Sequence, residues 1–238
     1  SEMCIRDSKA ELRTIPVKGL SMPDSIGAFT AGGHTYFATA NEGDAREWGV
    51  EEKDGGSGVY TDEVELKDVV EDGKVCEGAL GDVDLDKLAD KKEAGNLKLS
   101  NASGWNEEKG CFDELYAYGS RSFSIYDAEG NVVFDSGAEF EKITAELNEP
   151  GVFHHNADNE SAEFDDRSDN KGPEPEALTI GTVGDRTYAF IGAERVGGIF
   201  VYDVTDPANS SFVTYVNNRD FSTDESAAAG DLGPEGFA

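Results

Sequence analysis

Apolar and polar residues alternate along this chain in short runs, a pattern with a period of two residues that is typical of β-strands. The runs at 25–29 and 177–180 are each followed by a glycine-containing turn and a second β-rich run, at 35–40 and 187–192. Residues 199–217 then read as a third strand, an Asp-Pro turn and a fourth strand. The pattern therefore predicts antiparallel hairpins that extend into four-stranded meanders.

The two hairpins belong to an internal repeat. Residues 22–45 align with residues 174–197 without a gap, and the segment from Pro234 begins the same unit again. The alignment pairs residues at equivalent positions: Pro23 with Pro175, Asp24 with Glu176, Ile26 with Leu178, and Glu42 with Glu194. Four antiparallel strands in a unit of roughly 40 to 60 residues are the signature of a β-propeller blade.

We therefore expect an all-β fold, a β-propeller fragment with about three four-stranded blades and the start of another. The blade-like strands are expected across 22–67, 112–136 and 175–217, with the new blade opening at 234. Long polar loop insertions interrupt this pattern at 68–110 and 141–174. The first insertion contains a predicted short helix, with Asp86 as its cap and Gly95 as its stop.

The charge balance limits the possible partners. The 238 residues contain 50 Asp and Glu against 20 Lys and Arg, a formal net charge of −30. Such a chain is repelled by nucleic acids and anionic membranes, and no apolar run of about 18 residues predicts insertion into a membrane. The surplus of acids has two explanations: solvation of the surface, as in proteins from salty water, and binding of hard cations, which prefer carboxylate oxygens.

The start of the sequence, SEMCIRDS, resembles the translation of a transposon adapter used to prepare sequencing libraries. Residues 1–8 are therefore set apart from the fold as an artefact. The domain at 9–238 is expected to be truncated at both ends, so the missing blades of its parent chain are its first expected partners. Two cysteines remain, Cys76 and Cys111, which either form a disulfide in an oxidising compartment or stay free as buried thiols.

Acidic residues recur where the first strand of each repeat begins. Asp24, Glu176 and Glu235 each follow a proline at equivalent positions, and in a propeller such strands line the central channel. Carboxylates gathered around an axis repel one another unless a cation neutralises them. The predicted metal ligands are Asp24, Glu42, Asp44, Glu176, Glu194 and Glu235, with calcium as the first choice of ion and magnesium as the second. The alternative is that these acids cap backbone N–H groups at the blade mouths.

Two further groups of charged residues are candidates for ligand binding. Arg46, Arg121 and Arg195 either converge on a phosphate or carboxylate or form structural ion pairs with the surplus of acids. Asp165, Asp166 and Asp169 form a secondary acidic loop that either holds calcium or is simply solvated.

Four stretches, read in order, carry a resemblance to a known family: MPDSIGAF…TYFATANEGDAREW, ELYAYGSRSFSIYDAEGNVVFDSG, FDDRSDNKGPEPEAL and RTYAFIGAERVGGIFVYDVTDP. They resemble the choice-of-anchor I family, which overlaps with proteins called mesenchyme-specific cell-surface glycoproteins, over nearly all of residues 20–238. The resemblance implies a β-propeller that is exported and often tethered to the cell surface by an anchor beyond Ala238. The segment 68–110 matches most poorly, so Cys76 and its surroundings inherit nothing from the family.

The pattern and the resemblance together favour a non-enzymatic, extracellular or cell-surface β-propeller. It would be a binding or scaffold module for a surface or matrix ligand, stabilised by divalent cations. The alternative is a calcium-dependent phosphoester hydrolase, because some relatives carry alkaline phosphatase or phytase-like labels. In such an enzyme, carboxylates hold cations that clamp phosphate and activate water, and the arginines at 46, 121 or 195 assist. A propeller hosts many functions, so the fold alone does not decide between the two.

Overall fold

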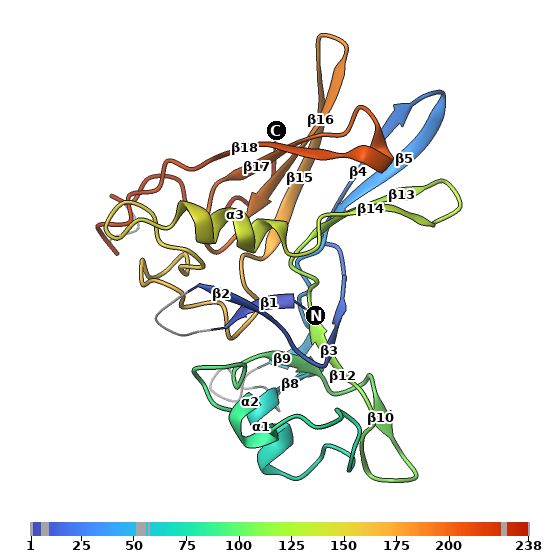
Figure 1. Ribbon diagram of the computed structural model, residues 1–238, viewed down its shortest axis with the longest axis vertical. Coiled ribbons are helices and arrows are strands. Elements are labelled where there is room, and N and C mark those ends of the chain that lie inside the picture. Colours follow the sequence, from blue (N-terminus) through green and yellow to red (C-terminus); the bar gives the residue numbers. More distant parts are fainter. Residues whose placement is uncertain (1, 6–9, 51–55, 57, 225–227, 238) are drawn as a thin grey trace.

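The computed structural model describes all residues except 1, 6–9, 51–55, 57, 225–227 and 238, and it forms two lobes along its long axis (Figure 1). The double-sheet lobe contains β4 (Ser25–Ala31), β5 (His34–Ala40), β13 (Phe123–Asp127), β14 (Val132–Asp135), α3 (Glu139–Leu147), β15 (Pro175–Val183), β16 (Arg186–Ala193), β17 (Ile199–Asp203), the 3-10 helix η2 (Pro207–Asn209) and β18 (Ser211–Val216). The disulfide lobe contains β3 (Val17–Leu20), β8 (Glu63–Glu65), α1 (Leu66–Glu71), α2 (Leu85–Leu88), β9 (Lys98–Ser100), β10 (Trp105–Asn106), β11 (Cys111–Phe112) and β12 (Leu115–Tyr118). Two outer strand pairs complete the fold: β1 (Glu2–Ile5) with β2 (Glu11–Thr14), and β6 (Glu47–Val50) with β7 (Gly58–Thr61).

The double-sheet lobe consists of two antiparallel four-stranded sheets with matching strand arrangements. Their strand orders are β4-β5-β13-β14 and β15-β16-β17-β18. The two first strands, β4 and β15, contact each other where the sheets meet. Gly27 permits this approach, because a Cβ at this position would lie 2.7 Å from Cδ2 of Leu178. The repeat in the sequence is therefore a repeat in the structure.

The all-β prediction is confirmed, but the expected grouping of strands is wrong. Residues 123–135, which were expected to start a separate blade, complete the sheet that begins at Ser25. The chain leaves this sheet after β5, builds the disulfide lobe and returns as β13, which pairs with β5 over five residues. A third four-stranded sheet, β3-β12-β9-β8, belongs to the disulfide lobe and differs from a meander because β3 and β12 are parallel.

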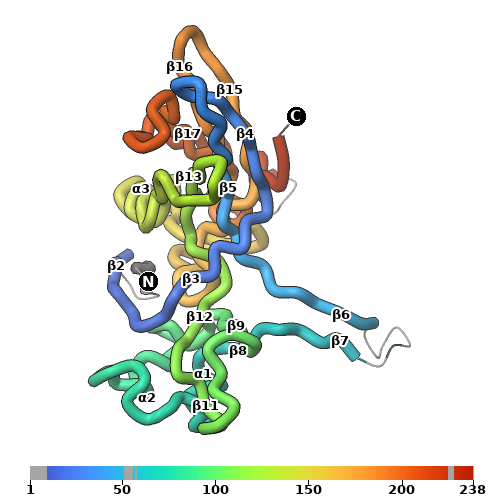
Figure 2. Tube along the Cα trace, turned by 90° about the vertical axis from the view of Figure 1, so that its right-hand side faces the viewer, coloured from blue at the N-terminus to red at the C-terminus, as the bar shows by residue number. Residues whose placement is uncertain are grey.

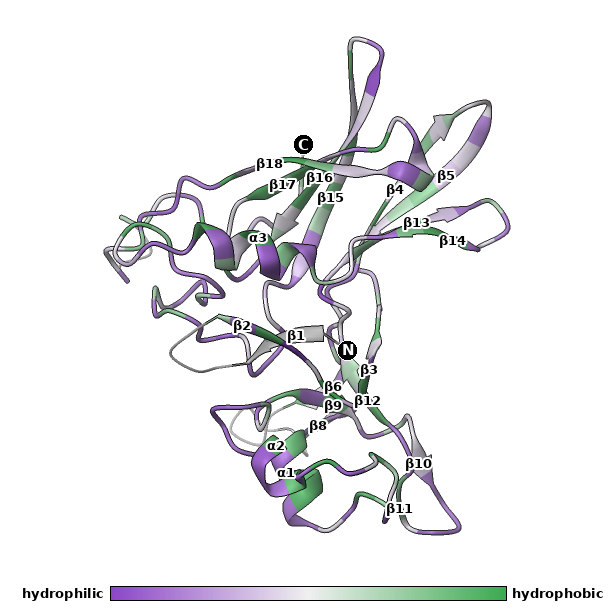
Figure 3. Cartoon of the chain, viewed as in Figure 1, coloured by the Kyte–Doolittle hydropathy of each residue, from purple (hydrophilic) through white to green (hydrophobic). Residues whose placement is uncertain are grey.

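Aromatic side chains fill the core between the second sheet and α3. Phe140 of α3 stacks on Phe200 at a centroid distance of 4.2 Å, and Phe123 meets Tyr202 edge-on at 4.7 Å. All four side chains are fully buried. Helix α3 lies at the start of a segment predicted as a loop, and it carries both hydrophilic and hydrophobic residues along its length (Figure 3). Phe140 and Ile143, three residues apart on one face of the helix, pack against this core, whereas Leu147 at the end of the helix is exposed.

The disulfide lobe has its own apolar core and a covalent link. Cys76 and Cys111 form a disulfide, which resolves the alternative that the sequence left open. The predicted helix from Asp86 to Gly95 is only partly confirmed. Helix α2 spans Leu85–Leu88, because the side chain of Asp84, not that of Asp86, accepts a hydrogen bond from the backbone nitrogen of Lys87 at 3.0 Å.

The hairpin of β6 and β7 projects from the body of the molecule (Figure 2). Trp48 and Tyr60 lie opposite each other across this hairpin and are about half exposed. At its base, Arg46 holds the buried Asp62 through two contacts of 2.9 and 2.7 Å. In the part of the chain that the structure describes, no helix is both long and apolar enough to cross a bilayer.

Candidate functional site

The two repeat units begin with the same unusual backbone conformation. Met22 and Glu174, which occupy equivalent positions directly before Pro23 and Pro175, have φ angles of +36° and +48°. A positive φ is uncommon for residues other than glycine, and such strain often persists where the surrounding structure requires it at a functional site. At both places the next acid, Asp24 or Glu176, is directed toward the same region between the sheets.

Three carboxylates from the two repeat units converge there. Oxygen atoms of Asp24, Glu42 and Glu176 lie within 4.8 Å of one another, and we call these residues the open carboxylate group. Asp24 and Glu42 also line a surface cavity of about 250 Å³, so the group is reachable from solvent. The Oε2 atom of Glu176 is buried and has no hydrogen-bond partner. A buried polar atom without a partner is costly, so this oxygen is suited to a ligand.

A second cluster shares Glu42 with the first. Oxygen atoms of Glu42, Glu174 and Glu194 also lie within 4.8 Å of one another, and we call these residues the neutralised carboxylate group. Glu174 is fully buried and forms ion pairs with Arg167, with Lys171 Nζ at 2.9 Å and with Arg195 Nε at 3.2 Å. The chain therefore supplies its own cations to this cluster.

Lys171 contacts Glu174 and also lies near Glu42, the carboxylate that the two clusters share. Its Nζ lies 2.9 Å from Asp44 Oδ1 and 2.9 Å from Glu174 Oε2, but 4.0 Å from Glu42 Oε1. Glu42 is 8% exposed, and this distant ammonium is the nearest cation that the structure gives it. One ammonium thus satisfies Asp44 and Glu174 directly and leaves Glu42 only weakly compensated.

The pKa values of these acids follow from burial and from the surrounding charges. Burial raises the pKa of Glu42 to about 8, with Lys171 opposing the shift and the nearby carboxylates adding to it. Burial together with Glu194, Asp24 and Glu235 raises the pKa of Glu176 to about 7. Burial also acts against the ionised form of Glu174, but Arg167, Lys171 and Arg195 outweigh it and lower the pKa of that carboxyl. The open group therefore has an unmet demand for positive charge, whereas Glu174 does not.

The position of Glu42 depends on a close contact between two loops. Gly43 has a φ of +80°, and a Cβ there would lie 1.7 Å from the backbone nitrogen of Gly119. No other residue fits at this position without moving the backbone. The loop that carries Glu42 is thereby fixed against the end of β12.

The geometry fits a hard cation. Calcium binds carboxylate oxygens at about 2.3–2.6 Å, so oxygens on opposite sides of one ion are at most about 5 Å apart. The separations in the open carboxylate group meet this limit. The group offers only oxygen ligands, which suits calcium or magnesium and does not suit softer metals that prefer sulfur.

A family profile described as the choice-of-anchor I domain matches residues 5–207. The chain belongs to the choice-of-anchor I family. The mesenchyme-specific cell surface glycoprotein of Strongylocentrotus purpuratus is 30% identical over 212 residues, which cover 80% of this chain and 26% of that protein. Gigasin-3a of Magallana gigas is 37% identical over 112 residues, which cover 45% of this chain and 39% of that protein. The matches thus span between about a quarter and two fifths of these curated relatives, and no solved structure matches the chain.

The structure of this choice-of-anchor I chain places the six predicted metal ligands unequally. Asp24, Glu42 and Glu176 form the open group, and Glu194 lies in the neutralised group. Asp44 is exposed and paired with Lys171, and Glu235 is exposed but close enough to Glu176 to raise its pKa. The sequence analysis missed Glu174 and Lys171. Neither recurs in the repeat. The alignment pairs Glu174 with Met22, and Lys171 lies before the aligned segment begins.

The three arginines predicted for an anion site are each paired with an acid of this chain. Arg46 holds Asp62, and Arg195 contacts Glu174 and Glu194. Arg121 is buried and donates to Glu141 Oε1 at 2.6 Å. The structure therefore matches the alternative of structural ion pairs and lends no support to a shared anion site.

The secondary acidic loop is largely packed into the protein. Asp165 and Asp169 are 1% exposed; Asp165 accepts a hydrogen bond from Ser168, and Asp169 accepts one from Asn96 Nδ2 at 2.6 Å. Asp166 is partly buried. The simple solvated loop is wrong for this segment, and within the described residues these three acids are not part of a carboxylate group with ligand-like spacing.

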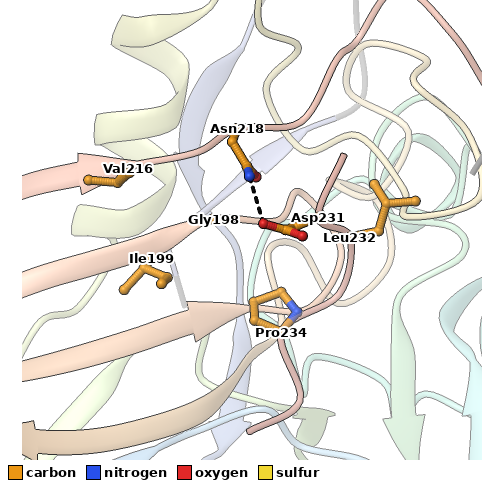
Figure 4. Close-up of a pocket in the computed structure, with 7 residues that line it drawn as sticks. All are labelled: Gly198, Ile199, Val216, Asn218, Asp231, Leu232 and Pro234. Atoms are coloured by element: carbon orange, nitrogen blue, oxygen red, sulfur yellow. Dashed lines mark hydrogen bonds between the residues drawn. The ribbon is translucent and has the colours of Figure 1, made fainter. Parts of the chain in front are cut away.

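A separate cavity of about 340 Å³ lies beside the ends of β17 and β18 (Figure 4). Its polar pair satisfies itself, because Asn218 Nδ2 donates to Asp231 Oδ2 at 2.6 Å. Ile199, Val216 and Leu232 make most of the remaining lining apolar. Among the described residues, the acid of this cavity is not part of a carboxylate group with ligand-like spacing.

Proposed function

We propose that this chain is part of an extracellular or cell-surface β-propeller module, a binding or scaffold protein that is stabilised by one divalent cation, calcium, in the open carboxylate group. The observation that carries the proposal is the convergence of Asp24, Glu42 and Glu176 from two repeat units around the buried, unpartnered Oε2 of Glu176. An ion at this place ties the first strands of two sheets to each other.

The arrangement of the sheets supports the propeller. Each of the two matching sheets is an antiparallel four-stranded unit, and their first strands, β4 and β15, lie next to each other. Blades of a propeller have this strand order, with the first strand nearest the central axis. The acids before β4 and at the start of β15 then face the channel, as the repeat in the sequence predicts.

The disulfide and the relatives support the location. Cys76 and Cys111 are bonded, and disulfides persist mainly in oxidising compartments such as the extracellular space. A relative with 30% identity over most of this chain is named as a cell surface glycoprotein. The hydrolase alternative gains nothing from the structure, because the arginines that would hold phosphate are engaged in ion pairs.

Thermal unfolding tests the cation. We expect millimolar calcium to raise the melting temperature above that in sodium chloride at matched ionic strength, because an ion that binds only the folded state stabilises it by mass action. Glu176→Gln should abolish the calcium-specific increase. Glu129→Gln, which removes the same charge from an exposed turn, should retain it. Equal effects of calcium and sodium on the unchanged chain would refute the cation site.

A further inference from the structure

The disulfide lobe contains a cavity that the proposed function does not use. It has a volume of about 460 Å³ and lies on elements other than those that carry the carboxylate groups. Its lining consists of Glu63, Val64, Val69, Lys74, Asn101, Trp105, Glu107 and Phe112. Pockets of this size, with an apolar floor and a few polar groups at the rim, are typical small-ligand sites.

One wall of the cavity is an aromatic side chain that packs against a buried ring. The ring of Trp105 lies 5.0 Å from that of the buried Phe112, at an interplanar angle of 75°. Phe112 directly follows Cys111, so the disulfide anchors β11, the strand that carries the Phe112 ring. Trp105 itself is only partly buried and keeps surface facing the cavity. Val64 and Val69 supply the apolar floor.

Most charges at the rim already have partners within the chain. Glu63 lies 3.4 Å from Lys98 Nζ, and Lys74 Nζ donates to Asp72 Oδ2 at 2.7 Å. These pairs reduce the demand of the cavity for a charged ligand. Asn101 donates its Nδ2 to the carbonyl of Thr61 at 3.3 Å, which leaves Oδ1 as a neutral acceptor. Glu107 is exposed at the rim and offers two carboxylate oxygens as further acceptors.

We propose that this cavity binds a pyranose unit of a carbohydrate. A pyranose has one apolar face, whose C–H groups carry partial positive charge and pack on the negative face of an indole ring. Its hydroxyl groups at the edge donate hydrogen bonds, which Asn101 Oδ1 and the carboxylate of Glu107 accept. An anionic ligand would have to displace Asp72 from Lys74 and would face the carboxylates of Glu63 and Glu107, and a simple amine could pair with Glu107 but offers no apolar face to Trp105. A neutral, hydroxylated ligand with an apolar face therefore fits the lining best.

Tryptophan fluorescence and calorimetry test the proposal. Trp48 and Trp105 are the two tryptophans of the sequence, so Trp48→Phe leaves an emission signal from Trp105 alone. Glucose, galactose, mannose and N-acetylglucosamine, each also as an oligosaccharide, are titrated into this variant. We expect at least one to change the emission saturably with millimolar or tighter affinity. The same glycans are tested in two forms, as free sugars and attached to a glycoprotein. Comparing the two affinities distinguishes a soluble sugar ligand from a glycosylated partner.

Matched variants locate the site. Trp105→Ala and Asn101→Ala should each weaken the calorimetric affinity by about tenfold, a loss of about 1.4 kcal/mol, whereas Trp48→Ala on the projecting hairpin should leave it unchanged. Trp105→Phe keeps an aromatic ring against Phe112 and guards against a folding defect; it should retain part of the affinity. Binding should also survive Glu176→Gln, which separates this site from the cation. Absence of binding to every saccharide, dependence on Trp48, or preferential binding of choline or lysine would each overturn the proposal.

Discussion

The two carboxylate groups of the double-sheet lobe share Glu42 but handle buried negative charge in opposite ways. In the neutralised carboxylate group, three cationic side chains contact Glu174. In the open carboxylate group, the nearest cation given by the structure is Lys171, at 4.0 Å from Glu42. Buried charge is tolerated only when it is paired, protonated or bound to metal. The chain therefore pairs Glu174 itself, and the weaker compensation of the open group is the basis of the proposed ion site.

The largest expected effect comes from breaking the neutralised group. Glu174→Gln removes the one fully buried carboxylate there and leaves Arg167, Lys171 and Arg195 without their common partner. Removing one member of a buried ion pair typically costs about 3–5 kcal/mol. We expect a loss of this order in the free energy of unfolding, measured by urea denaturation.

The control for this prediction is Glu194→Gln in the same group. Its side chain is 13% exposed and contacts Arg195 alone among the described cations, at 3.1 Å, so the expected loss is only about 1 kcal/mol. Adding Lys171→Gln to Glu174→Gln should recover part of the stability, because it reduces the excess of positive charge around the neutral glutamine at position 174. Equal losses for Glu174 and Glu194 would show that the contacts of Glu174 carry no special energy.

A third way of handling a buried ionisable group is to keep it neutral, as His155 shows. Its Nδ1 lies 2.8 Å from Thr144 Oγ1, and its buried Nε2 lies 3.8 Å from Asp165 Oδ1. Burial lowers the pKa of His155 to about 4, with Glu141 opposing the shift and Arg121 adding to it. Between this value and the unfolded pKa of 6.5, the unfolded chain binds more protons. Stability should therefore be fully present above pH 6.5 and fall as the pH drops to 4, by up to about 1.4 kcal/mol per unit.

Comparing two histidine variants isolates this contribution from other titrating groups. His155→Gln should reduce the dependence of the unfolding free energy on pH, by up to the binding of one proton, and His34→Gln, at the exposed start of β5, serves as the control variant. The measurement is chemical denaturation at intervals between pH 4 and 7. An identical slope in both variants would contradict a buried neutral imidazole.

Calcium titration of single variants tests which of the two carboxylate groups binds the ion. Asp24→Asn should weaken calcium binding because Asp24 belongs to the open group alone, whereas Glu194→Gln should leave it nearly unchanged. At calcium concentrations about 100-fold above the dissociation constant, the unchanged chain should gain about 2.7 kcal/mol of stability. Calorimetry and unfolding should agree on this ranking. If Glu194→Gln weakens binding more than Asp24→Asn, the ion occupies the other group.

The sequence predicted the strands and the acidic residues that belong to the internal repeat. The strands expected at 25–29 and 187–192 are β4 and β16, each within two residues at either end. Asp24 and Glu176 were identified because they recur before the same strand, and the structure brings them together. Alternating apolar residues and proline-acid pairs are local signals, which survive without knowledge of distant contacts.

The features that the sequence did not reveal depend on contacts between distant segments. The parallel pairing of β3 with β12 joins residues 17–20 to residues 115–118, and no local pattern specifies it. The completion of the first sheet by β13 after the whole disulfide lobe is equally non-local. Lys171 looked like part of a polar loop, and only the fold shows that its ammonium lies between Asp44 and Glu174.

The smallest expected effect comes from converting the neutralised group toward an open one. Lys171→Gln keeps a polar side chain but removes the ammonium that contacts Asp44 and Glu174, while Arg167 and Arg195 still hold Glu174. The electrostatic potential at Glu42 becomes more negative. Calcium should therefore bind the variant more tightly, by up to about tenfold or 1.4 kcal/mol. Without calcium the variant should be slightly less stable, because the carboxylates lose a counter-charge. Lys91→Gln, at an exposed position in the turn that follows α2, provides the matched control and should change neither quantity. Calorimetry at constant ionic strength measures the affinity, and weaker or unchanged binding in Lys171→Gln would show that this ammonium does not influence the ion site.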